Sequence, residues 1–291
     1  MGVYHAGSRA VQDRVGVRTQ ADHVGRSVGR GIREIAAAFL ELQPLLVVGA
    51  ASAGRVWASP LTGAPGFVRA TGPHRISVTT TPPPSDPLAT AFATPDTPVG
   101  TIALDPRTRR RMRLNGRLRP TARGFAVEAD QVFANCPRYL QRRQSYELVP
   151  DHRPGEPGRT TELTDEQAGF VALADTFFLA SVHEDGADVS HRGGNPGFVR
   201  VDSPGELSWR DYPGNSMFLT LGNLATDPRA GLLFLDWTTG TALQLTGEAH
   251  TEYGPDRRVR FTVREAIETP SAVPLRWSAP EYSPANPDPA G

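Results

Sequence analysis

The residues best suited to chemistry in this sequence are arginines gathered in one short segment. They are Arg107, Arg109, Arg110, Arg111 and Arg113, followed closely by Asn115 and Arg117. Alternation along a strand would place Arg109, Arg111 and Arg113 on one face. A guanidinium group presents paired N–H donors that match the oxygens of a phosphate. The segment therefore predicts either an anion site or, as is usual for charge runs, a solvated strand face.

The types and balance of charged residues exclude several classes of function. All 31 positive charges are arginines, because the sequence contains no lysine. This excludes a lysine Schiff base, a lysine general base and a complete Walker A phosphate loop. The 31 acidic residues bring the net charge to zero, so no global field favours nucleic acid or an anionic membrane as a partner.

Other reactive residues show no pattern typical of a catalytic or metal site. The seven histidines lack metal-ligand spacing, and His191, beside Arg192, is the one best placed to line a pocket. The single cysteine, Cys136, excludes an internal disulfide and a cysteine metal cluster, and we expect it to be buried. No Ser-His-Asp arrangement and no paired catalytic carboxylates are present, so no catalytic residue is assigned and no metal site is predicted.

An internal repeat decides the domain organisation. The motif Gly-Ala-Pro-Gly-Phe-Val-Arg at residues 63–69 returns as Gly-Asn-Pro-Gly-Phe-Val-Arg at residues 194–200, which is 131 positions later (194 − 63). The same offset relates residues 39–118 to residues 170–249 without a gap. Copies this long are domains rather than solenoid repeats, so we predict two domains that form a fused dimer. The glycines can serve as strand-entry turns, touch a ligand, or do both.

The elements that position these residues are short. Each copy reads as about six strands with a helix between the fourth and fifth, which favours a small barrel over an open sheet. A helix is expected over residues 21–42, ahead of the first strand. We predict an N-terminal arm (1–20), a first domain (21–149), a linker (150–160), a second domain (161–277) and a disordered, proline-rich tail (278–291).

Segments that would direct the chain to a membrane are not apparent. No apolar run approaches the ~20 residues of a membrane span. The N-terminus lacks the apolar core of a signal peptide. We therefore expect a soluble, cytoplasmic protein without a membrane partner, and we leave open whether two chains associate as a homodimer.

The second copy resembles a known family. The resemblance rests on residues 178–181 (Phe-Leu-Ala-Ser), residues 188–201, which include the glycine motif, residues 214–216 (Gly-Asn-Ser) and residues 227–234. In order and spacing these segments are similar to pyridoxamine 5′-phosphate oxidase-like FMN-binding split barrels, including a subgroup with two barrels in one chain. The first copy matches less closely. The resemblance implies a mainly β (α+β) fold: two tandem split β-barrels in an internal pseudo-dimer, with a few short helices.

The resemblance also implies FMN held between the barrels, mainly by the second copy. Backbone groups of Phe198, Val199, Arg200 and Val201 would face the pyrimidine edge of the flavin, and Asn215 and Ser216 would lie at its phosphate. Trp209 and Tyr212 are candidates to flank the ring, although aromatic residues more often belong to a core.

The phosphate needs a positive partner that the second copy does not clearly supply. The family usually has a basic pair where this chain has Ser216-Met217. The local options are Arg192, Arg200 and Arg210. In related dimers the equivalent of the arginine-rich strand reaches the neighbouring flavin, and the second copy lacks arginine over residues 241–248. We therefore expect Arg111 of the first copy to contact the phosphate, or Arg110 or Arg113 if the register differs by one.

The function implied by the resemblance is that of an FMN-dependent oxidoreductase with an unidentified small-molecule substrate and a nicotinamide electron donor. Hydride transfer needs no protein acid or base, since the cofactor carries the chemistry. The alternatives are a non-catalytic flavin- or haem-binding protein, a reductase that uses the deazaflavin F420, and a barrel without a cofactor. Oxidation of pyridoxamine phosphate itself is disfavoured, because no basic residues for that substrate's phosphate are recognisable.

Overall fold

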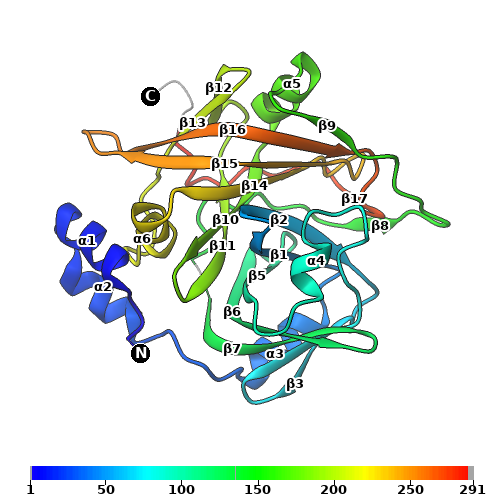
Figure 1. Ribbon diagram of the computed structural model, residues 1–291, viewed down its shortest axis with the longest axis horizontal. Helices are drawn as coiled ribbons and strands as arrows, with labels where there is room; N and C mark the ends of the chain where they lie inside the picture. Colours follow the sequence, from blue (N-terminus) through cyan, green and yellow to red (C-terminus); the bar gives the residue numbers. More distant parts are fainter. Residues whose placement is uncertain (1, 135, 288–291) are drawn as a thin grey trace.

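The computed structural model describes residues 2–134 and 136–287. Two antiparallel sheets of the same strand order account for most of the chain (Figure 1). The first has the order β2-β1-β5-β6-β7-β4-β3, and the second the order β11-β10-β14-β15-β16-β13-β12. A helix follows the fourth strand of each copy, as the sequence predicted. The two tandem split barrels expected from the sequence are confirmed.

The first barrel consists of β1 (Leu45–Ser52), β2 (Arg55–Thr62), β3 (Val68–Gly72), β4 (Arg75–Val78), α4 (Ala89–Phe92), β5 (Pro98–Asp105), β6 (Arg110–Thr121) and β7 (Gly124–Ala134). The second consists of β10 (Thr176–His183), β11 (Gly186–Gly193), β12 (Val199–Ser203), β13 (Glu206–Arg210), α6 (Leu219–Thr226), β14 (Arg229–Leu235), β15 (Ala242–Glu252) and β16 (Arg258–Thr269). Between them lie β8 (Tyr146–Leu148), β9 (Gly158–Thr160) and α5 (Asp165–Leu173), and β17 (Leu275–Trp277) pairs with β8. Each copy thus has seven strands rather than about six.

Successive side chains along a strand point alternately into the core of their own barrel and into the interface between the two barrels. Along β1, Leu46 and Val48 fill the first barrel, whereas Leu45 and Val47 join a third cluster. That third cluster also receives Phe178 from β10, and its other buried side chains come from both barrels and from the segments that follow them, such as Leu140 and Leu275. Because the first strands of both copies are buried on both faces, they read as continuous apolar runs rather than as alternating ones.

Two glycines show that the barrels meet about a pseudo-two-fold axis. A Cβ on Gly100 would lie 2.6 Å from the Asp188 backbone, and one on Gly231 would lie 2.6 Å from Cα of Trp57. Both pairs keep the repeat offset of 131 positions (231 − 100 and 188 − 57). Such reciprocal contacts define an isologous interface, and the close backbone approach explains why glycine occupies both positions.

The N-terminal region differs from the predicted arm. Residues 2–30 contain α1 (Ala6–Val15), which packs against α6, and α2 (Arg18–Gly25), which packs against α1 (Figure 1). Gly7 and Gly222 meet at this crossing, where a Cβ on Gly7 would lie 2.3 Å from the Gly222 carbonyl oxygen. The helix expected over residues 21–42 is interrupted, and α3 (Glu34–Glu41) is separate, because Gly29 leaves the helix and pairs with Val132 of β7.

The C-terminal tail is ordered as far as the structure describes it, which corrects the expectation of disorder for residues 278–287. Glu281 forms a bridge with Arg142, Ser283 is buried, and Asn286 donates a hydrogen bond to Asn195 over 2.9 Å. Tertiary hydrogen bonds thus hold a proline-rich segment that has little propensity of its own. The last part of the predicted tail, residues 288–291, lies outside the described residues. In the parts described, no helix has the length and hydrophobicity of a membrane span.

Candidate anion and cofactor site

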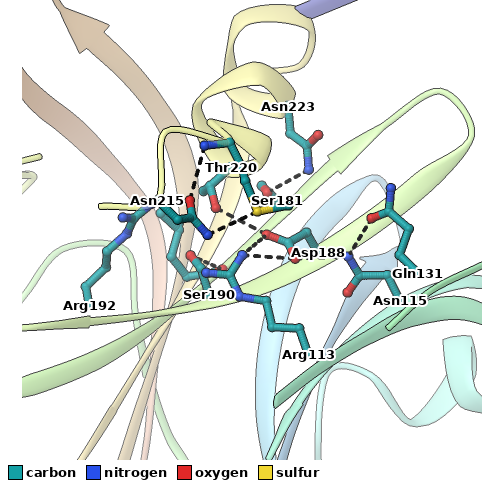
Figure 2. A network of polar contacts seen from close by, with 12 residues as sticks. Arg113, Asn115, Gln131, Ser181, Asp188, Ser190, Arg192, Asn215, Thr220 and Asn223 are labelled. Atoms are coloured by element: carbon teal, nitrogen blue, oxygen red, sulfur yellow. Dashed lines mark hydrogen bonds and ion pairs between the residues drawn. The ribbon is translucent and has the colours of Figure 1, made fainter. Parts of the chain in front are cut away.

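Two adjoining pockets lie at the barrel interface and share a wall of arginines. The aromatic pocket, of about 90 Å³, has the following lining: Arg111, Arg113, Cys136, Arg138, Tyr139, His191, Arg192, Gly193, Phe198, Trp209, Arg210, Tyr212, Gly214 and Asn215. The helix pocket, of about 60 Å³, is lined by Arg113, Arg192, Asp211, Tyr212 and residues 214–221. Arg113 comes from β6 of the first barrel and Arg192 from β11 of the second, so both barrels build the site (Figure 2).

The start of α6 opens into the helix pocket. Phe218, the residue before the helix, has a positive φ of 54° and provides no side-chain cap. Leu219, Thr220 and Leu221 form the first turn and line the pocket. The first N–H groups of a helix have no partner within it, and they carry the positive end of its dipole. This end of α6 therefore suits an anion.

The loop before α6 is held in shape by its own side chains. Oδ1 of Asn215 accepts a hydrogen bond from the Met217 backbone N–H at 3.2 Å. Ser216 adopts a left-handed conformation, with φ of 60°. From the N-terminal helices, Gln12 donates to the Met217 carbonyl at 2.8 Å. The α1 segment, far away in sequence, therefore helps to fix the mouth of the helix pocket.

Arg113 crosses the interface to a buried carboxylate. Its Nη1 lies 3.1 Å from Oδ2 of Asp188, and the two side chains are only 11% and 3% exposed. Asp188 also accepts hydrogen bonds from Asn115 and Thr220, at 3.0 and 3.2 Å (Figure 2). Both hydrogen bonds from Arg113 to Asp188 come from Nη1, and among the described residues its buried Nε has no hydrogen-bond partner. One side of this guanidinium thus remains available to a ligand.

Arg192 makes a longer ion-pair contact than Arg113 does. Its Nη1 lies 3.4 Å from Oδ1 of Asp211, whereas Arg257 approaches the same carboxylate at 2.6 Å. The buried Nε of Arg192 likewise has no hydrogen-bond partner among residues 2–134 and 136–287. Because Arg257 already compensates Asp211, much of the charge of Arg192 is free to act on the pocket.

Arg111 adds a third charge without a carboxylate partner. It donates to Nδ1 of His191 and to the Cys136 carbonyl, each over 2.6 Å. Burial, followed by repulsion from Arg113 and Arg192, lowers the pKa of Arg111 to about 9. Arg111 is therefore charged at neutral pH, in a cluster that an anion would relieve.

His191 is neutral beside this arginine. Burial and then the charge of Arg111 bring the pKa of His191 well below its ordinary value. Since Arg111 only donates, Nδ1 of the imidazole accepts, and the ring proton lies on Nε2. The tautomer of His191 is thus determined by a residue of the other barrel.

The aromatic pocket is bordered by tyrosines from the two copies. The rings of Tyr139 and Tyr212 have centroids 5.1 Å apart, and the Tyr139 hydroxyl donates to the Pro213 carbonyl. Trp209 packs edge-on against Phe177 in the core and is only 2% exposed. Cys136 is exposed at this pocket rather than buried as predicted, because it follows the last residue of β7 and leaves the sheet.

The structure brings together most, but not all, of the residues singled out in the sequence. The two pockets include Arg111, Arg113, Phe198, Trp209, Tyr212, Asn215 and Ser216. Val199 lies in the barrel core and Val201 packs against it. Arg200 is exposed and pairs with Asp202 at 3.6 Å. Arg110 is also exposed, because alternation along β6 turns it away from the face of Arg111.

Two residues of the site were not anticipated. Asp188 was quoted for the family resemblance but not as a partner of Arg113, and Tyr139 was not connected with Tyr212. An acidic residue inside the mostly buried strand β11 was the available signal, since an unpaired carboxylate there would be costly. No such signal existed for Tyr139, whose position depends on the irregular segment after β7.

A larger cavity, of about 470 Å³, lies on the other side of Asp188. Asp188 and Leu219 belong to its wall, together with the N-terminal residues 2–5. His5 and His183 stack in this wall with centroids 4.5 Å apart, and burial lowers the pKa of both imidazoles. Within the described residues, no group of three His, Cys, Asp or Glu side chains is arranged to hold a metal ion.

Comparison with known proteins finds one matching family model and several similar solved structures. Residues 163–288 match the family model described as pyridoxamine 5′-phosphate oxidase. A Lactobacillus delbrueckii protein assigned to that oxidase is 19% identical over 37% of this chain and 94% of its own, with a TM-score of 0.31. An FAD-binding protein of Mycobacterium smegmatis is 10% identical over 39% of this chain and 98% of its own, with a TM-score of 0.28. The FAD-binding protein of Mesorhizobium loti is 12% identical over 39% and 97%, also with a TM-score of 0.28. No curated protein matches.

Proposed function

We propose that the chain is an FMN-dependent oxidoreductase with its cofactor between the two barrels, and the match of residues 163–288 to the pyridoxamine 5′-phosphate oxidase family model supports this proposal. One observation carries the proposal. Arg113 and Arg192 direct unused guanidinium donors toward a pocket that also contains an uncapped helix start. A phosphate monoester, which carries nearly two negative charges, is the kind of group that this donor set fits.

The residues divide into two roles. Arg113, Arg192 and the first turn of α6 would hold the phosphate, and Arg111 would add charge from the side of His191. Phe198, Tyr212 and the edge of Trp209 would border the flavin ring.

The bound flavin would supply electron transfer to and from carbon or nitrogen. The chain's own residues then bind, orient and exclude water. His191, which is neutral at pH 7, can donate from Nε2 without placing a further positive charge beside the three arginines. The substrate and a nicotinamide electron donor remain expectations from the family resemblance.

The experiment that tests this function is a visible spectrum of the purified protein, followed by titration with FMN, riboflavin, F420 and haemin. We expect a flavin spectrum, or tight FMN uptake, with riboflavin bound at least about tenfold more weakly because it lacks the charge-assisted bonds. Bleaching by NADPH or NADH would support an enzyme. A Soret band, or preference for F420 over FMN, would contradict the assignment. FMN that no nicotinamide reduces would favour a binding protein or another electron donor.

FMN affinity should depend on pH through Arg111. The pKa of about 9 lies below the ordinary value of 12.5, so the unliganded site loses this charge as pH rises through about 9. We expect affinity to be steady from about pH 7 to 8 and to fall above about pH 9. Fluorescence titration across this range measures the effect, and the riboflavin curve corrects for ionisation of the ring itself. Arg111→Gln should remove the fall; an unchanged pH curve in that variant would show that another group causes it.

A further inference from the structure

The pseudo-two-fold axis creates a second position equivalent to the anion site. It lies between β2 and β15, next to α4. The repeat offset of 131 positions relates Gln244 to Arg113, Ser59 to Ser190 and Asp86 to Met217. The same offset relates the reciprocal contacts of Gly100 and Gly231, so these pairs are equivalent in space as well as in sequence.

A carboxylate occupies the start of the helix in this second position. Asp86 Oδ1 accepts hydrogen bonds from the Leu88 backbone N–H and from Ser59 Oγ, each at 2.8 Å. Its Oδ2 lies 3.3 Å from Nε2 of Gln244. Asp86 therefore satisfies the backbone N–H of Leu88, the residue before α4, whereas the side chain of Phe218, the residue before α6, caps no N–H group of that helix.

The first site presents positive charge to a ligand, whereas the second position presents a carboxylate. In the first site, Arg113 lies opposite an open helix start. In the second, the equivalent Gln244 is neutral and donates to Ser59, to Asp86 and to the Ala58 carbonyl. Burial raises the pKa of Asp86, and its hydrogen bonds act in the opposite direction and favour the ionised form. A phosphate entering there would meet a carboxylate, and it would meet the neutral Gln244 where the first site has Arg113, which opposes binding.

We propose that each chain holds a single phosphate-bearing ligand and that Asp86 is a built-in substitute for the anion in the second position. Asp86 with Gln244 thus determines the stoichiometry of the interface. The nature of the ligand, FMN, rests on the proposed function, whereas the number of anion sites does not.

The test is the number of equivalents bound in isothermal titration calorimetry. The wild-type chain should bind one FMN. The double variant Asp86→Ser with Gln244→Arg should bind two, because it removes the carboxylate and provides a guanidinium. Gln244→Arg alone is the matched control: the introduced arginine would pair with Asp86, and one equivalent is expected. Circular dichroism verifies that each variant is folded.

Several results would overturn the proposal. Two equivalents on the wild-type chain would show that Asp86 does not block the second position, and this holds even if the double variant does not fold. One equivalent on a folded double variant would show that other residues close it. If FMN does not bind at all, the proposed function fails separately, and titration with inorganic phosphate, followed by ³¹P NMR, still distinguishes one site from two.

Discussion

Arg192→Ala is expected to weaken FMN binding by roughly 10- to 150-fold and to leave riboflavin binding almost unchanged. A charge-assisted hydrogen bond contributes about 1.5–3 kcal/mol, and about 1.4 kcal/mol corresponds to a factor of ten. The substitution leaves no unpaired buried carboxylate, because Asp211 still pairs with Arg257 at 2.6 Å. Fluorescence titration with the two flavins measures the difference that the phosphate makes.

The matched control is Arg110→Ala. Arg110 carries the same charge on β6, but it is exposed and lines neither pocket. Its loss should change FMN affinity by less than about twofold, since exposed charges are screened. If both variants lose affinity equally, the effect is one of general charge, and the helix pocket does not hold the phosphate.

Much of the fold was predictable because it repeats. The offset between the two copies implied the pseudo-dimer, and the structure realises it in the paired approaches of Gly100 and Gly231. Alternation along a strand also predicts, from the sequence alone, that Arg111 and Arg113 share one face. The register then determined that this face, and not that of Arg110, turns toward the second barrel.

What could not be predicted depends on contacts between distant segments. Residues 2–20 look like a polar arm, yet α1 within them packs on α6 because Gly7 and Gly222 permit close approach. The tail through residue 287 has a composition typical of disorder, yet Asn286 reaches Asn195. Arg192 was one of several local candidates for the partner of the phosphate. Only the structure shows that Asp211 lies closer to Arg257 than to Arg192, so that the charge of Arg192 is not fully compensated.

The largest effect on stability is expected from Arg113→Ala. This change leaves Asp188, whose side chain is 3% exposed, with only the neutral donors Asn115 and Thr220. Removing one partner of a buried ion pair typically lowers the free energy of unfolding by about 3–5 kcal/mol. Urea denaturation, with equal m-values in both proteins, measures the loss. The exposed pair of Arg119 with Asp96 provides the comparison, and Arg119→Ala should cost no more than about 1 kcal/mol.

A second substitution separates the two roles of Arg113. Asp188→Asn in the Arg113→Ala background removes the stranded charge while keeping a hydrogen-bonding side chain, so most of the lost stability should return. FMN affinity should not return with it, because the guanidinium that faces the helix pocket is still missing. Stability that stays low in the double variant would show that the packing of Arg113, rather than the charge of Asp188, holds the barrels together. Recovery of FMN binding along with stability would mean that Arg113 serves the interface alone and that the phosphate is held elsewhere.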